Sequence, residues 1–268
     1  MRTTLLAFGF VALTAAAARA QTPAPPAPPP AAPLPPQGAV MFSSAEYRFQ
    51  LDLHVDDAQL AKWLPSGWVS NASTQGAAKD ANLRLIFVDA QEVEGPDNRV
   101  LGKGSNRIAM LAAPVKNGAT VGQMILGGIV EDPSNVPDGY GVYLPATGAR
   151  SSHTASDAGG TVTATEDWDF AAAGGEHLAV QLKYTRAPAN RGIGAAVFYN
   201  PANPTQYVVA HTDGSTDITR NATTNPPDRV QEFTLTASGG KYADLLAGAR
   251  PLSWDSQPVY SRTVNGAP

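Results

Sequence analysis

An uninterrupted alternation of apolar and polar residues near the start of the chain restricts the fold most strongly. From Tyr47 to Val55 every second residue is apolar. A period of two places such side chains on one face of a β-strand. We therefore predict a strand with one buried face, and residues 177–184 predict a second strand in the same way. The buried face of the first strand is expected to carry Tyr47, Phe49, Leu51, Leu53 and Val55.

Further apolar segments predict a mainly β domain. Strands are expected at 83–88, 108–113, 123–130, 161–170, 194–199, 206–211 and 230–236. Residues rich in Gly, Pro, Asn and Asp predict turns between them at 116–118, 137–139, 174–175, 200–201, 213–214 and 239–240. Short helices are expected at 58–64, after the capping residues Asp56 and Asp57, and at 242–247. About nine or ten strands with two or three short helices indicate a barrel or a sandwich. The pair Gly127-Gly128 inside an apolar strand indicates a bulge or tight bend.

The first 20 residues predict a secretory signal peptide. Arg2 precedes an apolar run from residue 5 to residue 17, and Ala18-Arg19-Ala20 fits the small-x-small rule for cleavage before Gln21. An uncleaved anchor is disfavoured, because a spanning helix needs about 20 apolar residues. We expect a periplasmic or secreted protein with no transmembrane segment after cleavage.

Residues 21–37 predict a tether before the domain at 38–268. Nine prolines lie between residues 23 and 36, and proline lacks the amide donor that helices and sheets require. An extended polyproline segment of roughly 45 Å would act as a spacer, although a ligand for a proline-recognition module is an alternative. One domain is expected, since no internal repeat or second linker follows.

Composition excludes several functions. The chain has no cysteine, so disulfides, thiolate chemistry and a lipoprotein anchor are excluded. Its formal charge of −4 becomes −6 when Arg2 and Arg19 leave with the signal (−4 − 2 = −6). An acidic surface without a basic cluster is a poor partner for nucleic acid.

No strong catalytic motif is present. The motifs G-x-S-x-G, H-E-x-x-H and His-x-His are absent, so neither a hydrolase elbow nor a metal site is predicted, and no cofactor is expected. Residues 151–153, Ser-Ser-His, with Asp157 supply triad residue types, but we interpret them as a loop because triads converge from separated segments. The carboxylates of Glu166, Asp167 and Asp169 are either an acid–base group or a solvated strand face.

A succession of short motifs over about residues 45–190 resembles acetoacetate-decarboxylase-like proteins. A strand enters a short helix that ends in a Leu-Pro pair, and a Phe-x-Asp strand end, a polar-Asn strand start and a Pro-containing turn follow. These motifs are residues 56–67, 86–89, 104–107, 118–122 and 141–147. The resemblance implies an antiparallel β-barrel with an internal pocket and a few short flanking helices.

The chain departs from that family at the residues that carry its chemistry. The family's decarboxylases have two adjacent lysines after the proline of the turn, where this chain has Ala146 and Thr147. The family's glutamate after the asparagine is Arg107 here. The resemblance therefore implies the barrel and its internal pocket without Schiff-base catalysis.

Five residues are the candidates for lining such a pocket: Arg107, Tyr143, Thr147, Arg150 and Glu166. A buried Arg107 would require an anionic partner, and a carboxylate ligand could provide it. The alternative is a solvated Arg107. We expect an exported protein that binds a small organic acid or a similar apolar anion. A lyase or hydrolase without a Schiff base, or an envelope interaction module, are the alternatives. Exposed strand edges also predict self-association into a homo-oligomer.

Overall fold

A computed structural model describes residues 33–136, 140–221 and 228–268. The chain from Leu34 to Pro268 forms one compact unit. The predicted signal peptide and residues 21–32 of the tether lie outside the described residues. The turn expected at 137–139 also lies outside them.

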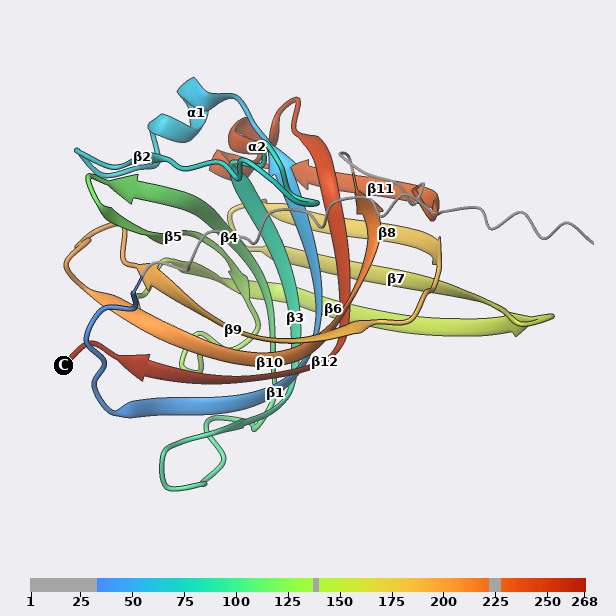
Figure 1. Ribbon diagram of the computed structural model, residues 1–268, viewed down its shortest axis with the longest axis horizontal. Helices are drawn as coiled ribbons and strands as arrows, with labels where there is room; N and C mark the ends of the chain where they lie inside the picture. Colours follow the sequence, from blue (N-terminus) through green and yellow to red (C-terminus); the bar gives the residue numbers. More distant parts are fainter. Residues whose placement is uncertain (1–32, 137–139, 222–227) are drawn as a thin grey trace, which may run out of the picture. The chain divides into compact units, whose positions relative to one another are not determined.

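The described residues form twelve strands and two short helices (Figure 1). No helix among them is long and apolar enough to cross a membrane. The elements are β1 (Val40–His54), α1 (Asp57–Ala61), β2 (Val69–Ser70), β3 (Leu83–Glu94), β4 (Asn106–Asn117), β5 (Thr120–Val130), β6 (Tyr143–Ala158), β7 (Thr161–Ala172), β8 (His177–Thr185), β9 (Asn190–Tyr199), β10 (Tyr207–Asn221), β11 (Val230–Ser238), α2 (Gly240–Leu246) and β12 (Arg250–Gly266).

Seven strands close into a ring, which confirms the predicted barrel. Their order is β1-β3-β4-β5-β9-β10-β12 and back to β1. Neighbours are antiparallel except β5 and β9, which pair in parallel through only Gln123 with Phe198 and Met124 with Tyr199. The other sheet, β6-β7-β8-β11, is joined to the ring where Tyr143–Pro145 of β6 pair in parallel with β5.

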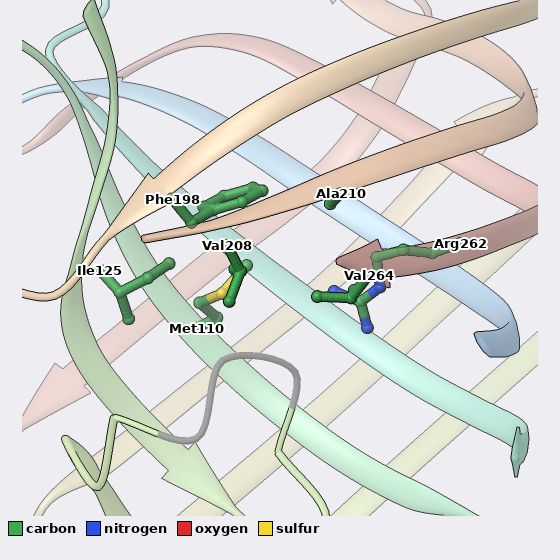
Figure 2. Close-up of a pocket in the computed structure, with 7 residues that line it drawn as sticks. All are labelled: Met110, Ile125, Phe198, Val208, Ala210, Arg262 and Val264. Carbon is green, nitrogen blue, oxygen red and sulfur yellow. The ribbon is translucent and has the colours of Figure 1, made fainter. Parts of the chain in front are cut away.

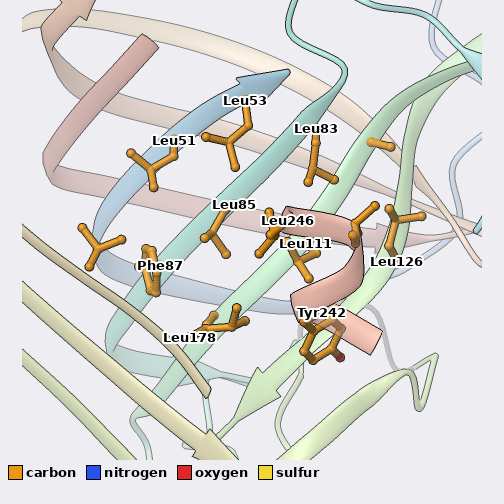
Figure 3. Close-up of a cluster of buried hydrophobic side chains, with 14 of the residues drawn as sticks. Leu51, Leu53, Leu83, Leu85, Phe87, Leu111, Leu126, Leu178, Tyr242 and Leu246 are labelled. Carbon is orange, nitrogen blue, oxygen red and sulfur yellow. The ribbon is translucent and has the colours of Figure 1, made fainter. Parts of the chain in front are cut away.

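Alternate side chains of the ring strands enter two separate hydrophobic cores. Leu51, Leu85 and Leu111 face outward and pack with Leu178 of β8 and Tyr242 of α2 (Figure 3). The intervening residues face the inside of the ring and form the second core, which includes Ile86, Val88, Ile108, Met110 and Val264. Burial on both faces explains why the sequence of β3 is apolar without alternation. The predicted buried face of β1 is confirmed from Phe49 to Val55, and Tyr47 is half-buried against the outer core.

The glycine pair of β5 allows close approach of two neighbouring elements. Gly127 and Gly128 have φ of 135° and 149°, and the register with β4 shifts beside them. A Cβ on Gly128 would lie 2.0 Å from the carbonyl oxygen of Ala109. The Tyr242 hydroxyl accepts from the Gly128 amide (2.8 Å) and donates to the Gly128 carbonyl (3.0 Å). The predicted bulge is thus confirmed, and it joins α2 to the ring.

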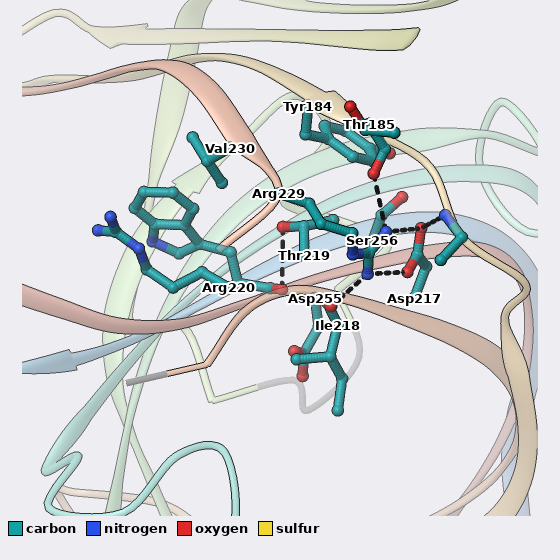
Figure 4. Close-up of polar contacts among 12 residues, drawn as sticks. Tyr184, Thr185, Asp217, Ile218, Thr219, Arg220, Arg229, Val230, Asp255 and Ser256 are labelled. Carbon is teal, nitrogen blue, oxygen red and sulfur yellow. Dashed lines mark hydrogen bonds and ion pairs between the residues drawn. The ribbon is translucent and has the colours of Figure 1, made fainter. Parts of the chain in front are cut away.

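An arginine clamp connects the second sheet to the ring (Figure 4). Arg229, just before β11, donates to the Thr185 carbonyl (2.8 Å), to the Ile218 carbonyl and to the Asp217 carboxylate (2.5 Å). Asp217 also accepts from the Ala187 amide (3.0 Å). The side chain of Asp217 is 5% exposed, so this pair is buried and structural.

Three sequence predictions were wrong. Residues 141–147 and 151–157, expected as a turn and a loop, lie largely within β6. This strand is rich in Ser, Thr and Ala, so it lacked an apolar period. The Asp213-Gly214 pair lies inside β10, where a Cβ on Gly214 would lie 2.7 Å from the Tyr260 ring. Its glycine therefore serves packing and makes no turn. The strand β12 was not predicted, because Pro251 and Pro258 interrupt its pattern.

Candidate functional site

The inside of the ring contains an apolar cavity with a single charged wall residue. In Figure 2, Arg262 lies beside Val264 on one side of the cavity and Ile125 lies on the other side. Met110 and Val208 lie between the two sides. The cavity has a free volume of about 10 Å³, which suffices for about one water molecule. Its lining is Met110, Ile125, Phe198, Val208, Ala210, Arg262 and Val264.

Arg262 belongs to a buried cluster of three charges. It donates to Glu46 Oε1, and Arg48 Nε lies 3.2 Å from Glu46 Oε2. Ser44 Oγ donates to Glu46 Oε1 at 2.5 Å. The side chains of Arg262, Arg48 and Glu46 are 5%, 6% and 0% exposed. Burial opposes ionisation of Glu46, but the charges of Arg262 and Arg48 outweigh it and hold the pKa of Glu46 below its usual value.

The cluster carries one positive charge in excess, since two guanidinium groups face one carboxylate. Arg48 Nε faces Glu46 Oε2 in the ion pair, but the Nε atom of Arg262 is buried and has no hydrogen-bond partner among the described residues. An unused donor on a buried cation is costly unless something accepts from it. A carboxylate is the group that a guanidinium binds best. The cavity wall is therefore suited to the charged end of a small organic acid.

Two carboxyl groups lie near each other on the same inner face of the ring. Asp52 and Asp255 alternate with the outward-facing Leu51 and Trp254, so both point inside. Arg84 Nε donates to Asp52 at 2.9 Å. Burial, followed by the negative charge of Asp52, raises the pKa of Asp255 to about 7. This pair places a group that can gain and lose a proton near neutral pH inside the ring.

Two of the predicted site residues belong to a polar network between the ring and the second sheet. Glu166 of β7 accepts from His153 Nδ1 (2.7 Å), from the Tyr184 hydroxyl (3.2 Å) and from the Tyr47 hydroxyl. The hydrogen bond to Glu166 and the negative charges of Asp89, 3.9 Å from Nε2, and Glu166 outweigh the effect of burial and raise the pKa of His153 to about 9. His153 is therefore an imidazolium held between two carboxylates, and it stacks on the Tyr47 ring at 3.8 Å.

Arg107 lies at the solvent end of this network. Its Nε donates to Ser151 Oγ (3.1 Å), and its Nη1 donates to Glu131 (3.3 Å). Ser151 in turn donates to Asp89 at 2.6 Å. The protein itself thus supplies the anionic partners of Arg107. Ser151 donates to Asp89 and makes no hydrogen bond to His153, so the Ser, His and Asp types of this segment do not form a catalytic triad.

The other three predicted site residues lie elsewhere. Tyr143 is buried in the inner core and also borders an outer groove. Thr147 is exposed and donates to the Ala171 carbonyl (3.2 Å). Arg150 is 67% exposed and lies 3.8 Å from Asp167 and 3.5 Å from Asp169. Only Glu166 and Arg107 of the five candidates therefore share a network, and ligand binding by any of the five stays a prediction.

The charged cluster was missed by sequence analysis, although a signal for it was present. Glu46 and Arg48 flank Tyr47 in the alternating strand, on the side interpreted as polar. A closed ring buries that side, so charged residues there must pair with one another. Their partner Arg262 lies in β12, the strand that the sequence did not predict.

Comparison with known proteins identifies the fold. No family model matches the chain, and no curated protein matches it in sequence. An acetoacetate decarboxylase-like enzyme from Sphingomonas wittichii RW1 superposes with a TM-score of 0.53 at 14% identity, over 85% of this chain and 91% of that one. MppR, an enduracididine biosynthesis enzyme, superposes in its HEPES-bound form with a TM-score of 0.52 at 13% identity, over 88% and 87%. MppR bound to the condensation product of pyruvate and imidazole 4-carboxaldehyde gives 0.51 at 12% identity, over 88% and 89%.

These similarities extend along nearly the whole described unit and along most of each related structure. Identities of 12–14% account for the lack of any match in sequence. The ring of strands and the attached second sheet therefore have the acetoacetate-decarboxylase-like fold.

Proposed function

We propose that the protein binds a small organic acid inside the strand ring, with the acid's carboxylate on Arg262. The observation that carries the proposal is the position of Arg262. It is a buried cation with an unused Nε donor, and it lies on the wall of an otherwise apolar cavity. A carboxylate there would pair with the excess positive charge, and its apolar end would contact Met110 and Phe198.

Two further observations favour a short acid and binding without a Schiff base. MppR, which shares the fold, has been solved with pyruvate. None of the residues that line the cavity here is a lysine, and the resemblance drawn from the sequence places Ala146 and Thr147 at the positions of that family's lysine pair. Because the free volume is only about 10 Å³, entry of an acid requires a side chain to move. Met110 suits that role, since the thioether chain adapts its shape easily.

Isothermal titration calorimetry of the full chain tests the proposal. Pyruvate, acetate and butyrate are the probes, and acetone is the uncharged control. We expect R262M to weaken binding of acids by at least tenfold, which corresponds to about 1.4 kcal/mol. E46Q is expected to strengthen binding, because it leaves both arginines without their carboxylate. M110A is expected to admit butyrate better than the wild type does.

The matched control is R150M, which removes an exposed arginine of the second sheet. Absence of acid binding in both the wild type and M110A would refute the proposal. Equal affinities of the wild type and R262M, or of E46Q and the wild type, would show that the cluster does not hold the carboxylate. R262M is expected to weaken acid binding and E46Q to strengthen it. A folding defect would weaken binding in both variants, so the stronger binding of E46Q cannot be explained by one.

We also propose that the protein is exported, with cleavage before Gln21. The short charged start, the apolar run and the Ala18-Arg19-Ala20 site support this proposal. N-terminal sequencing of the protein from periplasmic and culture-medium fractions of an expressing bacterium tests it. A mature chain that starts at Gln21 is expected. A chain that keeps residues 1–20 and stays in the cytosol would contradict export.

A further inference from the structure

A broad groove lies on the outside of the molecule, away from the cavity of the ring. Five parts of the chain border it: α1 with the residues after it, β5, the start of β6 with the segment before it, Pro201 after β9, and α2. Its volume is about 760 Å³, within the range of pockets that hold small molecules. The lining residues are Gln59, Lys62, Trp63, Leu126, Gly141, Val142, Tyr143, Leu144, Pro201, Lys241 and Asp244.

The lining combines an apolar base with a positive rim. Leu126 is buried in the outer core, and Trp63 and Leu144 pack against that core. Lys62 and Lys241 supply two positive charges against the single negative charge of Asp244. Neither lysine forms an ion pair with a carboxylate among the described residues. The formal charge of the whole chain is −4, so an excess of positive charge along this groove would attract anions locally.

The position of Lys241 is set by aromatic rings. Its Nζ lies 5.0 Å from the centre of the Trp63 ring and 5.5 Å from that of Tyr242. The two rings stack at 6.0 Å, and Tyr242 is in turn bonded to Gly128 of the ring. Lys62 donates to Gln59 at 2.8 Å, which leaves its other ammonium protons available. Lys241 is exposed, and its contacts with the two rings restrict the positions of its ammonium group, which lowers the entropy cost of binding an anion.

We propose that this groove is a second binding site, which takes a larger organic anion with an apolar body, such as an aryl carboxylate. The carboxylate would lie between Lys62 and Lys241, and the apolar body would cover Leu126 and Leu144. The site is distinct from the ring cavity, which has no lysine and about 10 Å³ of space. The inference does not depend on the function proposed for Arg262.

The test uses 2-naphthoate as the probe and 2-naphthamide as its uncharged analogue. The full chain is labelled with ¹⁵N, and the four tryptophan indole signals are followed during titration. W63F identifies the Trp63 signal. We expect 2-naphthoate to shift that signal in a saturable way and to leave the signals of the buried Trp168 and Trp254 in place. Binding should weaken about tenfold in K62Q/K241Q, because two charge-assisted contacts are lost, and 2-naphthamide should bind far more weakly than 2-naphthoate.

Two controls separate this site from other causes. K183Q removes a lysine that pairs with Glu232 on the second sheet, and it should leave binding unchanged. R262M changes only the ring cavity, so it too should leave 2-naphthoate binding unchanged, even if binding of pyruvate is lost. The inference is overturned if 2-naphthoate produces no saturable shift of Trp63. It is also overturned if K62Q/K241Q binds as well as the wild type, or if the amide binds as well as the acid.

Discussion

Replacing His153 should remove a pH-dependent part of the stability of the protein. The side chain is 23% exposed and lies between Glu166 and Asp89, and these carboxylates raise the pKa of His153 from 6.5 to about 9. A raised pKa means that the folded state holds the proton more tightly than the unfolded state. The difference is worth about 3 kcal/mol where both states are protonated.

The direction of the effect follows from that difference. The stabilisation is fully present below pH 6.5, and it decreases as the pH rises through the folded-state value of about 9. The free energy of unfolding of the wild type should therefore fall by about 3 kcal/mol between pH 6 and pH 9.5 through this residue alone. H153Q keeps a donor for Glu166 but has no charge to lose. Its free energy of unfolding should be lower at pH 6 and should not show that fall.

Urea unfolding at pH steps from 6 to 9.5, followed by tryptophan fluorescence, measures both curves. Trp168 is fully buried and lies 4.7 Å from the His153 ring, so its emission reports this region. The difference between the two chains cancels the contributions of other groups, such as Asp255. H211Q is the matched control, because His211 is bonded to the neutral side chain of Gln37 at the surface. Parallel curves for wild type and H153Q would refute the assignment of a shared proton to this network.

Three further predictions concern the ring. D255N should raise the free energy of unfolding by about 4 kcal/mol more at pH 8 than at pH 4, because it removes a negative charge whose pKa is raised from 3.8 to about 7 by burial and by Asp52. Urea unfolding at the two pH values checks this, and an equal gain at both would contradict it. R229A should lower the free energy of unfolding by about 3 kcal/mol, since it leaves the buried Asp217 without its partner. The control R191A removes one side of an exposed ion pair and should leave the melting temperature unchanged. G128A should prevent cooperative folding, because its Cβ would lie 2.0 Å from a carbonyl oxygen. The control G148A has open space around the Cβ and should melt like the wild type. Thermal melts followed by circular dichroism distinguish the two variants.

The sequence predicts the fold well wherever burial is one-sided or complete. The strand from Tyr47 to Val55 and the apolar segments of β3, β4 and β5 were predicted because their side chains enter a core. The Asp56 cap of α1 was also predicted, and its side chain accepts from the Gln59 amide at 2.9 Å. The strand β6 could not be predicted in this way. One of its faces contacts the His153 network and the other faces solvent, so neither face required an apolar period.

The sequence predicted the type of site, an arginine that binds a carboxylate, but not the residues that form it. Those residues are brought together by strand pairing across the whole chain. Glu46 and Arg262 are 216 residues apart, and only the pairing of β1 with β12 brings them together. Arg107 was chosen from the resemblance to a family, on the argument that a buried arginine needs an anion. The argument was sound, but at that position Asp89 and Glu131 already provide the anionic partners of Arg107.

The same physical argument applies with more force to Arg262. Arg107 is 37% exposed and its charge is balanced by carboxylates of its own network, so the loss of water costs it little. Arg262 is 5% exposed and shares one carboxylate with Arg48, so the cluster retains a net charge in a place that excludes water. The Tyr260 ring lies against Arg48 at 4.4 Å and the Phe42 ring against Arg262 at 5.6 Å, and these contacts offset part of the charge. The proposed binding of an anion beside Arg262 rests on the part that the protein leaves uncompensated.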